Sequence, residues 1–148
     1  MAQYFRKILC PIDFDDGMVA GLDVARDLAL SCGSAADATI CLLHVVHMLP
    51  TPEVPPPMDS YLAMEAEAKQ RLDELAREHL SGKLKYEVHT AIGEPAHEIL
   101  GHVESLGVDS VVMATHGRTG VKHLILGSVA ERVVRECPRP VVTIHPHG

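Results

Sequence analysis

Short apolar runs alternate along the chain with longer segments in which apolar residues recur at helical spacing. A short, continuous apolar run is typical of a strand buried on both faces of a parallel sheet. The third run instead alternates apolar and polar residues, which favours an edge strand half open to water. The pattern predicts strands at Lys7–Ile12, Thr39–Val46, Leu84–Thr90, Asp109–Ala114 and Val141–Ile144.

Helical periodicity fills the intervals between these strands. Asp15 or Asp16 can cap the first helix, and Gly33 can end it. Strand–helix alternation of this kind calls for an α/β fold, a mostly parallel sheet with helices on both faces and right-handed crossovers. The predicted helices are Met18–Cys32, about Ser60–Leu80, Pro95–Leu106 and Ser128–Cys137.

A proline-rich segment, Pro50–Pro57, can be neither helix nor central strand. We expect a flexible loop over about residues 47–59. Because 148 residues suffice for one sizeable core, residues 1–148 are expected to form a single domain.

Composition narrows the function. Aromatic residues make up 3% of the chain and the formal net charge is −7, which argues against nucleic acid as a partner. No apolar run approaches the roughly 20 residues of a membrane span, and the first residues lack a signal peptide. We expect a cytoplasmic protein with no membrane contact.

Cysteine and histidine spacing does not indicate a metal site. The four cysteines sit singly in apolar segments without a C-x-x-C pair, as expected for reduced, buried thiols. The ten histidines are scattered, and the pairs His44/His47 and His145/His147 lack supporting cysteine or carboxylate spacing. No metal-ligating residues are predicted.

Candidate chemistry lies where parallel strands end. Ligands bind beyond the carboxyl ends of such strands, which points to Asp13 and to the segment that follows Ala114. Gly117 allows close backbone approach, and Gly127 with Ser128 offers amides and a hydroxyl at a helix start, where anions bind. Alternatively, Ser128 and Glu131 form a capping box that uses the hydroxyl locally. The P-loop, dinucleotide and nucleophile-elbow motifs are absent.

Three segments, Lys7–Asp13, Leu42–Val45 and Val112–Val133, closely resemble the universal stress protein family, and the resemblance covers nearly the whole chain. The family's ATP-binding branch carries G-x-x-G, nine residues, then G-[ST]. This chain matches all but the first glycine, which is Ala114. The resemblance implies a Rossmann-like, adenine nucleotide alpha hydrolase-like domain with an open, twisted five-stranded parallel sheet of strand order 3-2-1-4-5.

The resemblance also implies a nucleotide site. Pro11 and Ile12 would line the base pocket, and Asp13 would accept hydrogen bonds from the ribose. The backbone of Val45 would bind the adenine edge, and Met113 would help enclose the adenosine. Mg²⁺ would bridge phosphate oxygens rather than occupy a protein cage. The residues expected around the phosphates are His116, Gly117, Arg118, Gly127, Ser128 and Val129.

Some of these residues also have plain structural readings. Asp13 is equally suited to a turn, His116 could simply shape its loop, and Arg118 could be solvated. Ala114 departs from the ATP-binding pattern. If its position needs positive φ or tight ribose contact, the methyl group costs on the order of 1 kcal/mol. The sequence therefore predicts a competent but weaker site.

By resemblance, the protein is an ATP-binding stress-response regulator that could also take ADP or AMP, with no catalytic residues. It would form a homodimer through Val141–Ile144. Two alternatives stay open: a slow ATP hydrolase of the same superfamily, and a family member that acts through protein contacts alone. The S-G-G-x-D-S and H-I-G-H motifs of the adenylating relatives are absent.

Overall fold

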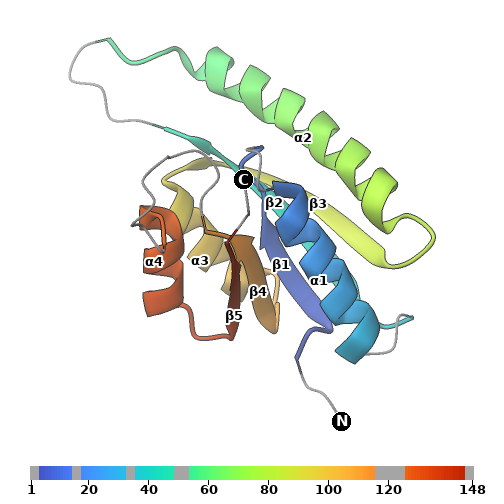
Figure 1. The fold of residues 1–148 in the computed structure, drawn as a ribbon. Coiled ribbons are helices and arrows are strands. Elements are labelled where there is room, and N and C mark those ends of the chain that lie inside the picture. Colours follow the sequence, from blue (N-terminus) through green and yellow to red (C-terminus); the bar gives the residue numbers. More distant parts are fainter. Residues whose placement is uncertain (1–3, 15–17, 33–35, 49–53, 116–125, 146–148) are drawn as a thin grey trace.

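Five parallel strands form one sheet in the computed structural model, which describes residues 4–14, 18–32, 36–48, 54–115 and 126–145. The strands lie in the order β3-β2-β1-β4-β5, with helices on both faces (Figure 1). The predicted parallel sheet and its strand order are therefore confirmed. The elements are β1 (Lys7–Pro11), α1 (Met18–Cys32), β2 (Thr39–His47), α2 (Met58–Leu80), β3 (Lys85–Gly93), α3 (Pro95–Ser105), β4 (Ser110–Ala114), α4 (Ser128–Glu136) and β5 (Val141–Ile144).

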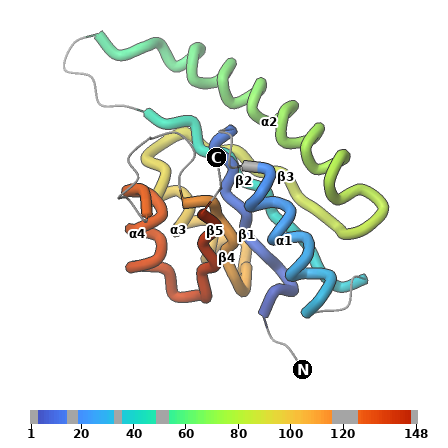
Figure 2. Tube along the Cα trace, in the orientation of Figure 1, coloured from blue at the N-terminus to red at the C-terminus, as the bar shows by residue number. Residues whose placement is uncertain are grey.

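The chain moves outward from β1 in two directions (Figure 2). It first builds β2 and the edge strand β3, and then returns to the other side of β1 for β4 and the edge strand β5. The predicted edge positions of the third and fifth strands are confirmed. Because the strand order reverses between β1 and β4, ligands are expected to bind beyond the carboxyl ends of these two strands.

Two strands are longer than the sequence pattern indicated. β2 runs to His47 and β3 to Gly93, because their pairing continues without a break to that last pair of residues. The predicted β2 stopped before the exposed His47, and the predicted β3 stopped at Thr90, before the apolar residues Ala91 and Ile92.

The loop predicted over residues 47–59 is shorter at both ends. His47 belongs to β2, and α2 begins at Met58, directly after Pro57. Pro57 has the φ of −63° to which its ring confines it, and it stands at the N-cap position. Residues 49–53 lie outside the described part of the chain, as do Asp15, Asp16 and Gly33.

Alternating side chains of the central strands supply two cores. Ile8 and Cys10 of β1 pack with α1 and α2 on one face of the sheet, whereas Leu9 packs with α3 and α4 on the other. Leu72 of α2 and Ile99 of α3 are among the helical residues that close these cores. A strand buried on both faces therefore explains the continuous apolar runs.

Asp109 fixes the amino end of β1 beside that of β4. Its carboxylate accepts hydrogen bonds from the amides of Phe5 and Lys7, at 2.7 and 2.9 Å. It also accepts one from the hydroxyl of Ser110 at 2.8 Å, which pairs the polar group of a fully buried residue. The two strands that flank the switch point are thus joined at the end opposite the site.

The amphipathic helix α2 covers the outer half of the sheet with a single stripe. Its buried residues are Tyr61, Ala68, Leu72, Ala76 and Leu80, whereas Leu62 is 49% exposed. None of the helices in the described ranges combines the length and hydropathy needed to cross a membrane.

Leu72→Ala should lower the free energy of unfolding by about 2–5 kcal/mol, because it leaves a cavity under α2 where Leu72 is completely buried. Leu62→Ala removes the same atoms from the exposed side of the helix and should change stability by less than about 0.5 kcal/mol. Urea unfolding followed by circular dichroism measures both. An equal decrease in the free energy of unfolding in the two variants would show that α2 does not pack on the sheet as described.

Candidate functional site

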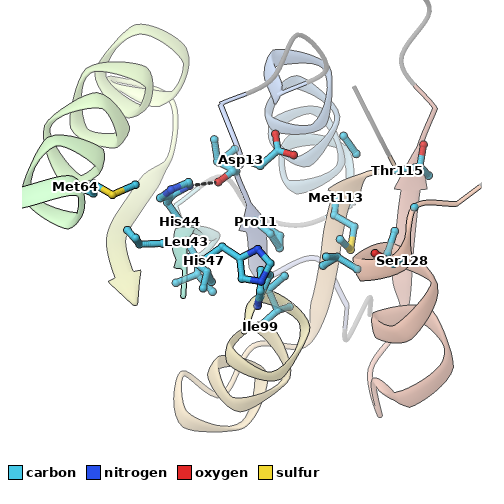
Figure 3. Close-up of a pocket in the computed structure, with 18 residues that line it drawn as sticks. Pro11, Asp13, Leu43, His44, His47, Met64, Ile99, Met113, Thr115 and Ser128 are labelled. Atoms are coloured by element: carbon cyan, nitrogen blue, oxygen red, sulfur yellow. Dashed lines mark hydrogen bonds between the residues drawn. The ribbon is translucent and has the colours of Figure 1, made fainter. Parts of the chain in front are cut away.

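A cavity of about 420 Å³ lies beyond the carboxyl ends of β1, β2 and β4 and reaches the start of α4 (Figure 3). Its volume falls within the range of roughly 300–1,000 Å³ that is usual for ligand pockets. It occupies the switch point of the sheet, where the strand order predicts a ligand.

Pro11 explains why the sheet opens here. β1 pairs with β4 only at Ile8 and Leu9, although it stays paired with β2 as far as Pro11. The Ile12 amide donates to Leu43 O of β2 at 2.8 Å, so the backbone nitrogen of Pro11, one residue earlier, faces β4. Proline has no N–H to donate, so the ladder with β4 cannot continue there.

Nine of the twelve residues predicted for the site line this one cavity. His116, Gly117 and Arg118, predicted to lie near the phosphates, fall outside the described residues. The structure thus brings the described candidates together from four separate segments, while their contacts with a ligand stay predictions. The nine are Pro11, Ile12, Asp13, Val45, Met113, Ala114, Gly127, Ser128 and Val129.

One wall of the cavity is apolar and its rim is polar. Ile12, directly after β1, and Met113 of β4 are 3% and 5% exposed, and both line the cavity. Asp13 follows the end of β1 and is exposed; Figure 3 shows it between His44 and Met113. An apolar wall beside a single carboxylate suits a ligand with a flat apolar part and hydroxyl groups.

His44 positions the turn that carries Asp13. Its Nδ1 lies 2.7 Å from Ile12 O, and since a carbonyl only accepts, Nδ1 carries the proton. The His44 ring also packs on Phe14, with ring centroids 4.6 Å apart. Phe14 has a φ of 63°, and the Arg71 guanidinium of α2 lies 4.0 Å from its ring centroid. Contacts from β2 and α2 therefore support a left-handed residue directly after Asp13.

The start of α4 does not form the capping box considered above. Gly127, with φ −70° and ψ 168°, is the N-cap, and no side chain caps the helix. Ser128 lies one residue too far along the helix to act as the cap. Glu131, the other half of the proposed box, pairs with Arg135.

The α4 start instead offers donors to the cavity. The amides of Ser128, Val129 and Ala130 have no acceptor within the helix, and none among the described residues. All three residues line the cavity. Amides that point out of a helix start, together with its dipole, favour an anion.

Thr115 joins β4, β5 and the start of α4. Its amide donates to Ile144 O at 2.8 Å, and its own carbonyl accepts from the Gly127 amide at 3.3 Å. Its hydroxyl donates to Ile144 O at 3.2 Å. The chain on the two sides of residues 116–125 is therefore held together at the cavity.

The backbone conformation of Ala114 rules out one of the two reasons for which its methyl group was expected to weaken binding. The non-glycine residues with positive φ in the described ranges are Phe5 and Phe14, so a need for positive φ at Ala114 is wrong. A side chain at Gly21 of α1 would come within 4.0 Å of the Ala114 methyl group, which therefore packs near α1. Only the steric explanation, contact with a ribose, is left.

Sequence reasoning missed the residues that reach the cavity from helices and from the ends of strands. Met64 comes from α2, and Pro95 and Ile99 from α3, and their arrival depends on how each helix packs. The one available signal was position, since His44 and Thr115 lie within the segments Leu42–Val45 and Val112–Val133 that resemble the family. The missed lining residues are Leu43, His44, Val46, His47, Met64, Pro95, Ile99, Thr115 and Ala130.

Comparison with models of protein families matches residues 4–145 to the universal stress protein family, and the chain therefore belongs to it. The chain is 31% identical over 150 residues to universal stress protein YxiE from Bacillus subtilis, with 95% of this chain and 99% of that protein covered. It is 29% identical over 143 residues to a universal stress protein from Methanocaldococcus jannaschii, with 95% and 82% covered.

Solved structures share the fold. Universal stress protein UspA from Lactobacillus plantarum superposes with a TM-score of 0.78 at 21% identity, covering 97% of this chain and 100% of that one. A universal stress protein in complex with cAMP gives 0.64 at 18% identity, covering 98% and 100%. One from Archaeoglobus fulgidus in complex with dAMP gives 0.62 at 19% identity, covering 97% and 99%.

Ser128→Ala should leave the free energy of unfolding unchanged within about 0.5 kcal/mol, because the hydroxyl does not cap α4. Glu94→Ala is the positive control and should cost about 1 kcal/mol, because Glu94 caps α3 by accepting from the amides of Ala96 and His97. Thermal unfolding measures both. A loss of about 1 kcal/mol in Ser128→Ala would restore the capping box.

The Glu94 control also has a defined pH dependence. Partial burial raises the pKa of Glu94, but hydrogen bonds from His97 and Ala96 and the charge of Arg132 outweigh it and lower the pKa below its ordinary value. The carboxylate therefore contributes stability above the ordinary glutamate pKa and loses it as the pH falls through the lowered value. The cost of Glu94→Ala should shrink over that acid range.

Proposed function

We propose that this chain binds ATP at the switch-point cavity, with ADP or AMP able to occupy the same site, and acts as a regulatory stress-response module with little or no turnover. The observation that carries the proposal is the cavity itself, in which an apolar wall, one carboxylate and the amides of a helix start face the same space. These three features match a base, a ribose and a phosphate, respectively.

The adenosine half of the proposed site is built from strand ends and from α3. Ile12, Met113 and Ile99 supply buried apolar surface for the base, and the backbone of Val45 lies on the same wall for its polar edge. Asp13 accepts hydrogen bonds from the ribose hydroxyls. His44 supports this role by holding the Ile12 carbonyl immediately before it.

The phosphate half lies at α4. The amides of Ser128 and Val129 donate to phosphate oxygens, and so does the Ser128 hydroxyl, which does not cap α4. His116, Gly117 and Arg118 are proposed to contact the phosphates as well. Asp13 is the one carboxylate among the described lining residues, so a protein cage for Mg²⁺ is not formed by them. Mg²⁺ fits better as an ion carried by the phosphates.

Related proteins support an adenine nucleotide as the ligand. Two universal stress proteins with this fold have structures in complex with cAMP and dAMP. Both ligands share the adenine base and a phosphate with ATP, which is the chemistry that the two halves of the cavity suit.

We also propose a homodimer in which β5 pairs with its copy. β5 is an edge strand of four half-buried residues, Val141–Ile144, whose outer backbone groups have no neighbouring strand within the described sheet. A second copy would cover this edge with the same residues, as two-fold symmetry requires.

Identification of the nucleotide that leaves the purified protein on denaturation tests the function directly, and calorimetry and a hydrolysis assay with Mg-ATP complete the test. Retained ATP with negligible turnover is expected. Robust turnover would instead make the protein an ATP hydrolase, and no binding at millimolar nucleotide would leave a family member that acts through protein contacts.

Asp13→Ala should weaken Mg-ATP binding by about tenfold or more, because hydrogen bonds to a charged group contribute about 1.5–3 kcal/mol and 1.4 kcal/mol corresponds to a factor of ten. Asp27→Ala, which removes the same charge from the exposed side of α1, is the matched control. Calorimetric titration gives both affinities. If both variants bind like the wild type, Asp13 is only a turn residue.

Ala114→Gly should tighten Mg-ATP binding several-fold if the methyl group crowds the ribose. The expected gain in affinity does not come from relief of backbone strain, because Ala114 lacks positive φ. Calorimetry on the folded variant measures the effect, and unchanged or weaker binding would remove the steric explanation too.

A further inference from the structure

Three potential metal ligands meet on the face of the sheet that α3 covers. The Sγ of Cys41, a carboxylate oxygen of Glu87 and a ring nitrogen of His89 all lie within 4.8 Å of one another. Glu87 Oε1 and His89 Nε2 are 3.0 Å apart. We call these three residues the Cys41 cluster.

The sheet register creates this cluster. Cys41 of β2 pairs directly with Glu87 of β3, and His89 follows two residues later on the same face of its strand. Spacing along the chain did not indicate it, because Cys41 is far in sequence from the other two. Glu87 and His89 are polar residues in the alternating pattern of an edge strand, and that pattern predicts that they face solvent.

The Cys41 cluster is separate from the nucleotide cavity. None of its three residues lines that cavity, although Leu43, which pairs with His89, does. The cluster lies nearer the middle of β2 and β3, away from the carboxyl ends. The proposal for this cluster therefore does not depend on the function proposed above.

We propose that the Cys41 cluster binds a thiophilic divalent cation of the zinc class, with Cys41, Glu87 and His89 as its protein ligands. Thiolate, imidazole and carboxylate together are a typical ligand set for Zn²⁺. Ca²⁺ and Mg²⁺, which prefer oxygen ligands only, are not expected to bind. Three protein ligands leave a fourth position for water or another side chain.

His102 of α3 lies near His89 but outside the group whose ligand atoms lie within 4.8 Å of one another. Its ring centroid lies 6.5 Å from that of His89. Its Nδ1 lies 2.7 Å from Glu98 O and donates to it, which fixes the ring orientation and leaves Nε2 as the available nitrogen. A backbone carbonyl on the other ring nitrogen is the usual support of a histidine that binds metal.

The cation can reach the cluster from solvent. Cys41 is fully buried, but the side chains of Glu87 and His89 are 41% and 28% exposed. Lys7 pairs with the far oxygen of Glu87, Oε2, at 3.6 Å, which leaves Oε1 on the side of His89. The bound metal would compete with this ion pair for the carboxylate, which limits the expected affinity.

Binding replaces a proton with a metal ion. Burial, and then the nearby Glu87 carboxylate, raise the pKa of the Cys41 thiol to about 12, so the free thiol is protonated and a poor nucleophile. The cation forms a bond to sulfur as the S–H proton leaves to solvent, with no change of oxidation state. The same chemistry argues against covalent catalysis by Cys41.

Titration of the purified protein with Co²⁺ tests the proposal, since a cobalt–thiolate bond gives a charge-transfer absorption band in the near ultraviolet. We expect the band to saturate at one Co²⁺ per chain and to disappear when Zn²⁺ is added. Cys41→Ser should abolish the band. Cys10→Ser should retain it, because Cys10 is equally buried but packs on the opposite face of the sheet.

Glu87→Gln and His89→Gln change partly exposed residues, so they test the site even if Cys41→Ser does not fold. Each should weaken Co²⁺ binding by at least about tenfold, as loss of support around a metal site already does. Absence of the band in the wild-type protein overturns the proposal. A band that persists in Cys41→Ser, or unchanged affinity in both Gln variants, also overturns it.

Discussion

The early end of the ladder between β1 and β4 is the constraint on which the rest of the structure depends. The two strands pair only at Ile8 and Leu9 and are tied at their amino ends by Asp109. Beyond Leu9 the two strands do not pair, because Pro11 has no N–H to donate to β4. Pro11 thus ends the pairing of β1 with β4 next to the cavity at the switch point.

Most of the fold could be predicted because parallel strands and amphipathic helices have distinct periodicities. The apolar runs located β1, β4 and β5 nearly to the residue. The ends of β2 and β3 were missed for different reasons: β2 continues to the exposed His47, whereas β3 continues past Thr90 through the apolar residues Ala91 and Ile92 to Gly93. The end of a strand is set by backbone pairing, which the pattern of apolar and polar side chains does not mark.

The candidate site divides in the same way. Asp13 could be predicted because topology alone brings strand ends together. Met113 was implied only by the resemblance to the universal stress protein family. Met64 and Ile99 could not be predicted, because their positions depend on how α2 and α3 pack on the sheet. The capping box failed for a local reason, since the backbone dihedrals at Gly127 decide which residue is the N-cap. Sequence spacing does not encode that choice.

The contact between Phe14 and Arg71 has an energetic consequence for α2. Phe14 takes a left-handed conformation that costs roughly 1–2 kcal/mol, and the His44 ring and the Arg71 guanidinium pack against it there. If ATP binds at Asp13 as proposed, the ligand and α2 both favour the same backbone state of this turn. Thermodynamic reciprocity then requires that whatever seats α2 more firmly raises nucleotide affinity by the same factor by which nucleotide favours the seated helix. The longest described helix would thereby act as the reporter of site occupancy.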